Sequence, residues 1–395
     1  MAKHIWMIAY TNYSTDARVR REAEAVASVG GYAVHLMVLR EGNKPKVYVH
    51  DGVEVHELNV AKYRGGSMLQ YLISYVRFLM RAFFKCSQLS WRGSVDLVHV
   101  HNMPNFLVFA AILPRCLGAK IVLDVHDTLI ETHATKFRGL LSKIVTAALV
   151  IEEYVCCKFA SRVICVNDIQ RDAVLNRGVV REKTLVLMNL PDPAKFQMEK
   201  VVYGASDGIV KIVYFGTITH RLGVDLLLRA LHDARKVVPG LRCFVYGDGD
   251  KRQECVELSK ELGLDDIVQF SNGAVPFDEL IQKIRGMDLV VIPNRHNTAT
   301  ELMLPVKMLE GMAMGIPAVV PRLKTIEHYF AADQVFYYTS EDISSLTEAI
   351  LRACRDTTER LRKAANACQF FEKYSWNSQK QDLFQLYRSL VRDAV

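Results

Sequence analysis

Two series of short β-rich runs, each run followed by a longer amphipathic stretch, constrain the fold more than any other feature of this chain. Strands that alternate with helices predict parallel sheets with helical crossovers. The first series has strands at Ile5–Ala9, Val34–Leu39, Leu97–Val100, Ile121–Val125 and Val163–Val166, and helices at Asp16–Val29, Ser67–Ser87, Asn105–Leu117 and Leu140–Ala160. The second has strands at Val210–Phe215, Arg242–Tyr246, Ile267–Phe270, Leu289–Ile292 and Ala318–Val320, and helices at Val224–Val237, Lys251–Leu262 and Phe277–Ile284.

The length of 395 residues exceeds what one hydrophobic core usually serves, so two α/β domains are predicted, both Rossmann-like and doubly wound. Leu190–Gly208 carries two prolines and a glycine and has no periodicity of its own, which is typical of a linker. The predicted division is residues 1–190, a linker at 191–209, and residues 210–375. A C-terminal helix at 376–395 is expected to complete the first domain. Ligands of doubly wound domains bind at the carboxyl ends of the strands, so a cleft between two facing domains is the expected active site.

Composition narrows the class of protein. Half of the residues are hydrophobic and 24% are charged, which is typical of a globular protein. Nine cysteines are scattered without CxxC spacing, so neither a zinc site nor a disulfide framework is indicated, and a reducing cytosol fits. The N-terminal residues lack the order of a signal peptide, and no apolar run approaches the roughly 20 residues that span a bilayer. A cytoplasmic location is therefore expected.

The segment LMLPVKMLEGMAMGIPAVV, residues 302–320, has the layout of a nucleotide-sugar site. Pro305 suits the first helical position and leaves the amides of Val306 and Lys307 free to hold a phosphate. Lys307 opposes the helix dipole there, so an anion in front of it would explain its presence. Glu310 lies one turn further on. An ordinary amphipathic helix with a solvated lysine and glutamate explains the same residues equally well.

The chain resembles the retaining GT-B glycosyltransferases of family 4, the group 1 type. The resemblance covers nearly the whole chain, and its segments stand in the family's order: DARVRREAEAVASVGGYAV, DLVHVHNMPN, LDVHDT, LVLMNLPDPAKF, VYFGTITHRLGVDLL, VYGDGD and LPVKMLEGMAMGIPAVV. It implies a GT-B fold in which the second domain holds the nucleotide-diphosphate sugar and the first holds the acceptor. It also implies that the donor's anomeric configuration is kept.

The resemblance assigns roles within the last of these segments. Glu310 matches the family glutamate that accepts hydrogen bonds from the ribose hydroxyls, and a carboxylate can accept two donors at once. The amides of Val306 and Lys307 match those that grip the distal phosphate. The family pattern places another glutamate eight residues before Glu310, where this chain has Leu302. Glu301 is adjacent, and we expect it to contact the donor sugar in its place.

The loop that follows the first strand of the second domain also departs from the family. Relatives carry an arginine after the first glycine, Gly216, and a lysine before the second, whereas this chain has Thr217 and Leu222. A departing diphosphate needs cations or N–H donors in front of it. Arg221, together with Lys307, is our candidate for this role. The alternative is a solvated turn arginine.

Gly247 and Asp248 directly follow a strand, in the loop that the family places near the nucleotide base and ribose, although a simple strand-to-helix turn explains them as well. Asp248-Gly249-Asp250 is the only Asp-x-Asp of the chain and has no further acidic residue close by in sequence. No metal ion and no cofactor are therefore expected. Retention in this family is usually explained by attack on the same face, which needs no protein nucleophile.

In the first domain, Arg18, Arg20 and Arg21 crowd three cations into the first turns of a helix, against the macrodipole. Arg18 is a candidate contact for the donor phosphates or an anionic acceptor. The alternative is that the arginines spread around the helix and pair with Glu22 and Glu24. The two interpretations are equally supported by the sequence.

Three histidines lie near predicted strand ends. His126 follows the strand Ile121–Val125, with Asp127 beside it to orient the ring, and the family places a histidine here near the 6-hydroxyl of the donor sugar. His101 reaches the end of another strand, and His99 is expected in the core. We favour His126 as the catalytic-site histidine.

One feature of the sequence bears on the identity of the acceptor. Ser67–Arg92 places Arg77, Arg81 and Lys85 on one helix face among several aromatic residues, which is typical of an interfacial helix on anionic lipid. A crossover helix with its basic edge in water is the other interpretation. No basic stripe with base-stacking aromatics accompanies the predicted cleft, so nucleic acid is not an expected partner.

The function predicted is a retaining, metal-independent hexosyltransferase. It would move a sugar from a nucleotide-diphosphate sugar to a saccharide, either lipid-linked or part of a polysaccharide or cell-envelope glycan. It would work in the cytoplasm, peripherally at the inner face of a bacterial membrane. Two alternatives stay open: a nucleotide-sugar epimerase or hydrolase of the same shape, and a non-catalytic partner protein that binds nucleotide sugar.

Overall fold

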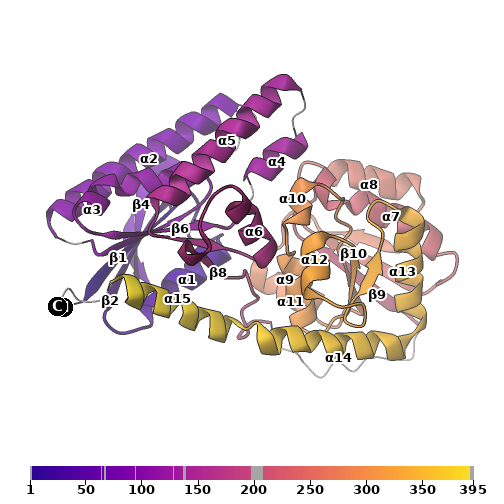
Figure 1. Cartoon of the computed structure of the whole chain (residues 1–395). Coiled ribbons are helices and arrows are strands. Elements are labelled where there is room, and N and C mark those ends of the chain that lie inside the picture. The colour runs from indigo at the N-terminus through magenta and orange to yellow at the C-terminus, as the bar shows by residue number, and fades with distance from the viewer. Residues whose placement is uncertain are drawn as a thin grey trace. The chain divides into compact units, whose positions relative to one another are not determined.

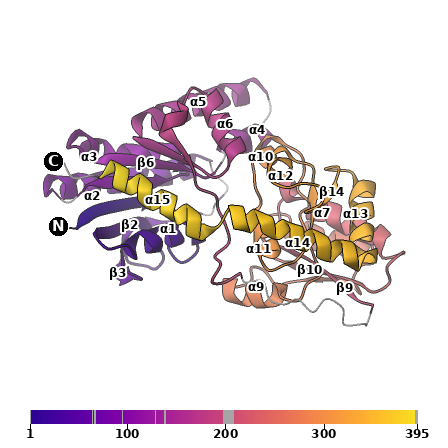
Figure 2. The same cartoon turned by 60° about the horizontal axis from the view of Figure 1, so that its bottom comes forward.

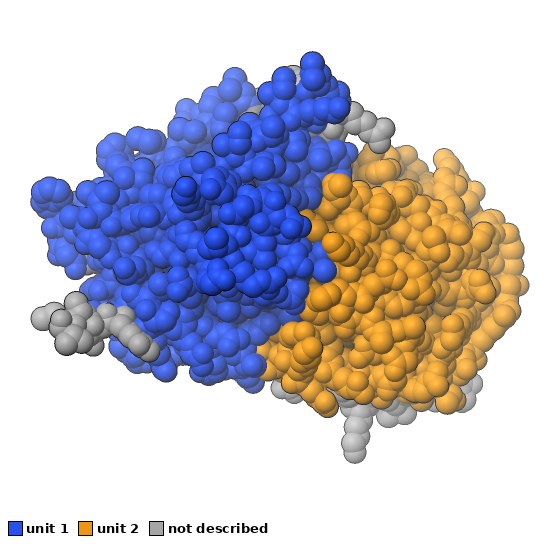
Figure 3. Space-filling model, in the orientation of Figure 1, with its two compact units in different colours: residues 1–189, 377–395 blue, residues 190–376 orange. Residues whose placement is uncertain are grey.

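The computed structural model describes residues 2–63, 65, 68–93, 95–127, 129–136, 139–196 and 208–391. The chain forms two compact units, shown in Figure 3: unit 1 is residues 1–189 with 377–395, and unit 2 is residues 190–376. Of the predicted linker, residues 191–196 belong to unit 2, and residues 197–207 lie outside the described residues. The C-terminal helix belongs to unit 1, apart from its first residue.

Unit 1 is built on an eight-stranded sheet of order β3-β4-β2-β1-β5-β6-β7-β8. All neighbouring strands are parallel except β3 and β4. The strands are β1 (Lys3–Ala9), β2 (Tyr32–Arg40), β3 (Val47–His50), β4 (Val53–Ala61), β5 (Leu97–His101), β6 (Lys120–Val125), β7 (Arg162–Cys165) and β8 (Thr184–Val186). The helices are α1 (Ala17–Ala27), α2 (Met68–Trp91), η1 (Asn105–Ala111), α3 (Ile112–Cys116), α4 (Leu129–Lys136), α5 (Leu140–Phe159), α6 (Asp168–Asn176), η2 (Arg181–Lys183) and α15 (Trp376–Leu390).

The two faces of this sheet have different covers. Figure 1 shows α2, α3 and α5 on one side and α1 and α15 on the other, and the view of Figure 2 places α15 along unit 1. Alternate residues of each strand point to opposite faces. Trp6, Val98 and Ile121 pack with Phe78 of α2 and Cys156 of α5 in one core cluster. The opposite face receives the side chains that lie between them, including two histidines and an aspartate described below.

Several parts of unit 1 were not predicted correctly, and the helices α4, α6 and η2 were not predicted at all. The sequence prediction missed the β3–β4 hairpin, although its turn, Asp51-Gly52, has positive φ at both residues and is a strong hairpin signal. It also missed the short strand β8. The helix expected at 105–117 is a 3₁₀-helix followed by the short α3, which contains Pro114, a residue without an N–H to continue a helix.

Unit 2 has a six-stranded, fully parallel sheet of order β11-β10-β9-β12-β13-β14. The strands are β9 (Val210–Phe215), β10 (Leu241–Tyr246), β11 (Val268–Phe270), β12 (Leu289–Val291), β13 (Ala318–Pro321) and β14 (Phe336–Tyr338). The helices are η3 (His220–Leu222), α7 (Val224–Ala234), α8 (Arg252–Glu261), α9 (Phe277–Ile284), α10 (Thr298–Glu301), α11 (Val306–Ala313), α12 (Lys324–Tyr329), α13 (Ile343–Arg355) and α14 (Thr357–Lys373). The sequence prediction omitted β14, α13 and α14.

The strand order reverses between β9 and β12, and this switch point is where doubly wound sheets form a crevice for ligands. The loops after these two strands meet closely. Gly223 has φ +67, and a Cβ on it would lie 1.9 Å from the carbonyl oxygen of Pro293. Helix α11 lies against β12 and β13, and a Cβ on Gly311 would lie 3.1 Å from the Val290 side chain. Close packing thus places the start of α11 near the crevice.

Candidate active site

The start of α11 has free hydrogen-bond donors. Pro305 is the N-cap, with φ −65 and ψ 115, so the first helical residue is Val306 and not Pro305 as predicted. An extended ψ at Pro305 explains the difference of one residue. Among the described residues, no side chain caps this end of the helix. The amides of Val306 and Lys307 are among the first four of the helix, which have no partner inside it, so they can donate to an anion.

Lys307 reaches back over the loop that follows β9. Its Nζ donates to Oη of Tyr214 at 3.2 Å and lies 4.7 Å from the centre of that ring. Tyr214 in turn donates to the carbonyl oxygen of Thr217 at 2.5 Å. Gly216 has φ +116, and a Cβ there would lie 2.4 Å from Nζ of Lys307. The positive φ favours glycine here, and a larger residue would also displace the end of the Lys307 side chain.

Two further charges surround Lys307. Burial lowers the pKa of Lys307 to about 8, while the Glu310 carboxylate opposes that shift and the Arg221 guanidinium adds to it. Glu310 and Arg221 are therefore close enough to Lys307 to influence its charge. Glu310 and Arg221 are both half-buried.

Hydrogen bonds from Arg295 hold the loop that carries Arg221. The backbone N–H of Arg295 donates to the carbonyl oxygen of Arg221 at 3.0 Å. The Arg295 guanidinium donates to both carboxylate oxygens of Asp225, at 2.8 and 2.5 Å, and to the His220 carbonyl oxygen at 2.6 Å. Arg295 was not among the predicted site residues. Its partners belong to η3 and α7, about 70 residues earlier in the chain, so no local pattern could have revealed it.

The loops after β9 and β10 contact each other at the same edge of the sheet. A Cβ on Gly247 would lie 1.8 Å from the carbonyl oxygen of Gly216. The N–H of Ile218 donates to the carbonyl oxygen of Asp248 at 2.8 Å. The Asp248 carboxylate accepts from the N–H of Gly249 at 2.8 Å. The predicted residues Gly216, Thr217, Gly247 and Asp248 thus lie in two adjoining loops.

Glu301 is already engaged. One carboxylate oxygen accepts from the backbone N–H of Lys324 at 2.9 Å, and the other lies 3.2 Å from Nε2 of His296. Thr325 also donates to the Glu301 carbonyl oxygen at 2.6 Å. These contacts tie Glu301 to the first turn of α12, and the predicted contact with the donor sugar would require Glu301 to change partners.

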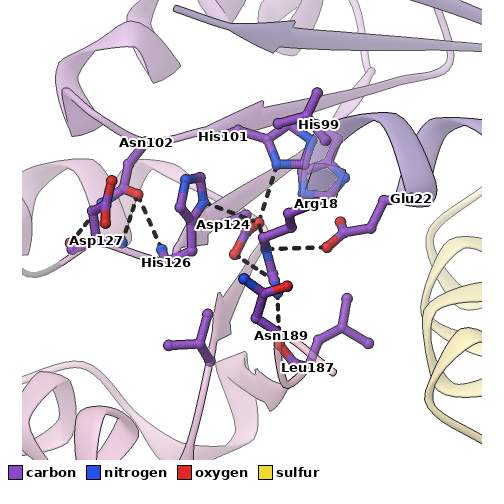
Figure 4. Close-up of polar contacts among 12 residues, drawn as sticks. Arg18, Glu22, His99, His101, Asn102, Asp124, His126, Asp127, Leu187 and Asn189 are labelled. Atoms are coloured by element: carbon purple, nitrogen blue, oxygen red, sulfur yellow. Dashed lines mark hydrogen bonds and ion pairs between the residues drawn. The ribbon is translucent and has the colours of Figure 1, made fainter. Parts of the chain in front are cut away.

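Unit 1 carries a buried polar cluster at the carboxyl ends of β5 and β6 (Figure 4). Arg18 of α1 donates to both oxygens of Asp124, at 2.9 and 3.0 Å, and to the carbonyl oxygen of Leu187 at 3.1 Å. Its Nε lies 3.1 Å from Glu22, and its side chain is 4% exposed. Arg18 is therefore an internal ion-pair partner and not the predicted donor or acceptor contact, because its polar atoms are saturated inside the unit.

The neighbouring arginines follow the alternative interpretation. Arg20 lies 3.4 Å from Glu24, and Arg21 donates to Oδ1 of Asn189 at 3.1 Å. The three cations spread around α1 and pair with separate partners. Pairing inside the unit explains how the helix tolerates positive charge in its first turns.

His126 is oriented by Asp124, not by Asp127 as predicted. Nδ1 of His126 lies 3.3 Å from Oδ2 of Asp124. Nδ1 of His101 lies 3.1 Å from the same oxygen. The correction follows from strand geometry, since Asp124 points to the face on which His101 lies. Oδ1 of Asn102 accepts from the backbone N–H groups of His126 and Asp127, both at 3.0 Å, and this fixes the loop after β6 (Figure 4).

The charges of the cluster balance one another. Burial favours the protonated form of Asp124, yet Arg18 and His126 hold the pKa of Asp124 well below its usual value. Burial disfavours the imidazolium of His126, but the Asp124 carboxylate outweighs this and raises the pKa of His126. Burial raises the pKa of Glu22. His126 is 15% exposed, so its ring stands at the edge of the cluster, while Arg18 and Asp124 are enclosed.

His99 is a core residue, as predicted, and is fully buried. Its Nδ1 lies 2.6 Å from Oη of Tyr387, which α15 contributes from the end of the chain. Glu22, His99, His101 and Asp124 have metal-ligand atoms within 4.8 Å of one another. The Arg18 guanidinium occupies the same cluster, and its charge disfavours a cation there.

Solved structures with this two-sheet architecture are GT-B glycosyltransferases. Residues 15–189 match the family model described as "Glycosyl transferase 4-like domain", and residues 210–356 match "Glycosyl transferases group 1". The chain belongs to the group 1 glycosyltransferases.

Two relatives and a solved structure are similar to this chain over most of its length. An uncharacterized glycosyltransferase of Methanocaldococcus jannaschii is 25% identical over 91% of this chain and 94% of its own length. The chitobiosyldiphosphodolichol beta-mannosyltransferase of Candida glabrata is 24% identical over 90% of this chain and 84% of its own. The crystal structure of Anabaena HepE in complex with UDP-glucose has a TM-score of 0.71 at 16% identity, and the match covers 98% of this chain and 99% of that one.

Proposed function

We propose that the protein is a retaining, metal-independent hexosyltransferase that uses a nucleotide-diphosphate sugar. The observation that carries the proposal is the arrangement around α11: free amides at Val306 and Lys307, the Lys307 ammonium beside Arg221, and the Glu310 carboxylate one turn on. Amides and cations suit a diphosphate, and a carboxylate suits the hydroxyls of a ribose. Gly216, Thr217, Gly247 and Asp248, in the two adjoining loops, would border the nucleotide. The solved HepE structure is a complex of that protein with UDP-glucose, which supports a nucleotide-diphosphate sugar as the donor.

The reaction we propose replaces one bond at the anomeric carbon by another on the same face. The bond from that carbon to the phosphate oxygen breaks, and the acceptor hydroxyl oxygen forms the new bond. The acceptor proton passes to the leaving phosphate. Lys307 and Arg221 would stabilise the charge that builds on the diphosphate, and a ring N–H of His126 would donate to a sugar hydroxyl.

The acceptor we propose is a saccharide carried on a lipid, used for a cell-envelope glycan at the cytoplasmic face of a membrane. The Candida relative is named for a diphosphodolichol-linked saccharide, which supports a lipid-linked substrate. No helix in the described part of the chain is long and apolar enough to cross a bilayer.

The experiment compares Glu310→Gln with the wild type in calorimetric titrations of UDP-, GDP- and ADP-sugars and in transfer assays with and without EDTA. Loss of a charged hydrogen-bond acceptor should weaken binding of the cognate donor about 10–100-fold. Glu261→Gln, at an exposed position of α8, is the matched control and should bind as the wild type does. Unchanged donor affinity in Glu310→Gln contradicts the donor site, and transfer abolished by EDTA contradicts metal independence. Equal nucleotide release without any acceptor would instead indicate a hydrolase or epimerase.

A further inference from the structure

Helix α2 leaves an apolar stripe uncovered on the outside of unit 1. Its inner face, with Phe78, Ala82 and Cys86, is fully buried in the core cluster. The outer face is apolar as well: Leu69 is 66% and Phe84 62% exposed, and the residues between them at helical spacing are also exposed, namely Leu72, Ile73, Val76 and Met80. A surface helix normally turns polar residues outward. This helix is apolar on two sides.

Helix α5 repeats the pattern. Cys156 and Cys157 are buried in the same core cluster as the inner face of α2. On the outside Leu140 is 77% and Ile151 63% exposed, and Ile144, Ala147, Ala148 and Val155 continue the stripe. Its two carboxylates turn inward, Glu152 to accept from Asn105 and Glu153 to pair with Arg177.

The two stripes point the same way. Both helices contact η1, and both rest on the same face of the sheet, so their outer faces are directed away from it together (Figure 1). Ile112, at the start of α3, is also exposed on this layer. We call the outer faces of α2 and α5 the two-helix surface. An exposed apolar surface of this extent normally marks an interaction site.

The charge beside the stripe identifies the partner. Residues 68–95 contain no aspartate or glutamate. Arg77, Arg81 and Lys85 follow one another at four-residue intervals along the edge of the stripe, and Arg92 follows the end of the helix. None of these four forms an ion pair with any of the described residues. Unpaired cations beside an apolar stripe fit an anionic lipid surface.

We propose that the two-helix surface docks on an anionic bilayer, with the apolar stripes at the level of the acyl boundary and the cations among the headgroups. A second copy of the chain fits less well, since a symmetric contact through this face would bring cations against cations without a carboxylate on α2 to pair with them. The inference rests on the proposed function for the acceptor that the bilayer would present.

Trp91 provides a direct probe. It is 79% exposed at the end of α2, whereas Trp6 and Trp376, the other two tryptophans, are buried. Addition of vesicles of phosphatidylcholine and phosphatidylglycerol should shift its fluorescence to the blue, and brominated lipid should quench it. Trp91→Phe should remove the signal and keep sedimentation with vesicles. A spectrum that anionic vesicles leave unchanged would overturn the proposal.

Paired variants test each part of the surface by vesicle co-sedimentation of the full chain. Arg77→Gln/Arg81→Gln should weaken binding to anionic vesicles at least tenfold, since each cation contributes to attraction. Val76→Ser/Met80→Ser and Ile144→Ser/Ile151→Ser should weaken it by a similar factor. Matched controls in unit 2 are Arg355→Gln/Arg362→Gln for charge and Val237→Ser/Leu361→Ser for apolar surface, and both should bind as the wild type does.

The outcomes separate this proposal from the proposed function. All variants should bind the soluble donor normally, because the substitutions lie outside unit 2 or on its exposed positions, and thermal unfolding should confirm that they fold. Wild-type binding by the α5 variant would overturn the two-helix surface. A dimer in light scattering that the serine variants dissociate would show a second copy as the occupant and would also overturn it. Normal vesicle binding with no donor binding would instead reject only the donor site.

Discussion

Arg18 in unit 1 and Lys307 in unit 2 both lie near the start of a helix, but their surroundings differ. Arg18 is enclosed by Asp124, Glu22 and the Leu187 carbonyl. Among the described residues, the hydrogen bond of Lys307 goes to a neutral hydroxyl, that of Tyr214, and burial lowers its pKa to about 8. A cation that the fold already neutralises has a structural role. A cation whose charge the fold neutralises only in part is available to bind an anionic ligand.

The largest effect expected is on stability, from Arg18→Met. Removal of the guanidinium leaves two buried carboxylates without their cation, which should lower the free energy of unfolding by about 3–5 kcal/mol. Urea denaturation of the full chain measures it. Arg20→Met, at a half-buried pair on the same helix, is the control and should cost less than about 1 kcal/mol. Equal losses for the two variants would remove the distinction drawn between Arg18 and an ordinary surface cation.

Lys307→Met should affect ligand binding more than stability, whereas Arg18→Met should mainly affect stability. The free energy of unfolding should change by no more than about 1 kcal/mol, because the substitution removes a desolvated cation with a neutral partner. Donor affinity should fall about 10–100-fold, since a charged group no longer faces the diphosphate. Calorimetry with the cognate donor and urea denaturation measure the two quantities. A stable variant with wild-type affinity would refute the role of Lys307.

The smallest effect concerns pH. Lys307 is protonated below its pKa of about 8 and loses its charge as pH rises through that value. Donor affinity should therefore be highest near pH 7 and fall about tenfold by pH 9, because the neutral amine attracts the diphosphate less. Lys307→Arg keeps its charge over this range and should show a flat profile. A profile of the wild type that is as flat as that of the variant would mean that Lys307 is not the titrating group.

Local pattern determined most of the elements. Alternating apolar runs were sufficient for β9, β10 and β12, and Asp16 caps α1 by accepting from the N–H of Val19 at 3.1 Å. The short strands β8 and β14 escaped prediction because a run of three residues carries little periodicity and forms only where a neighbouring strand pairs with it.

The candidate site was predictable where its residues are close in sequence. Val306, Lys307 and Glu310 lie within the first two turns of one helix, so spacing alone brought them together. Tyr214 was missed, although it lies on a predicted strand, because an aromatic residue on a strand is usually part of the core. Glu301 shows the reverse case: its position suggested a sugar contact, whereas its carboxylate reaches the start of α12, 23 residues further on.

By itself, the sequence determined the family, the two parallel-sheet units and the group of residues gathered at the start of α11, because these depend on contacts within a few residues or on periodicity. Only the tertiary structure decided that Asp124, 106 residues beyond Arg18, neutralises that arginine and orients His126. It also decided that α2 and α5 expose their apolar stripes on one face. The physical reason is the same in each case: charge pairing and exposure depend on which distant elements pack together, and no local pattern records that.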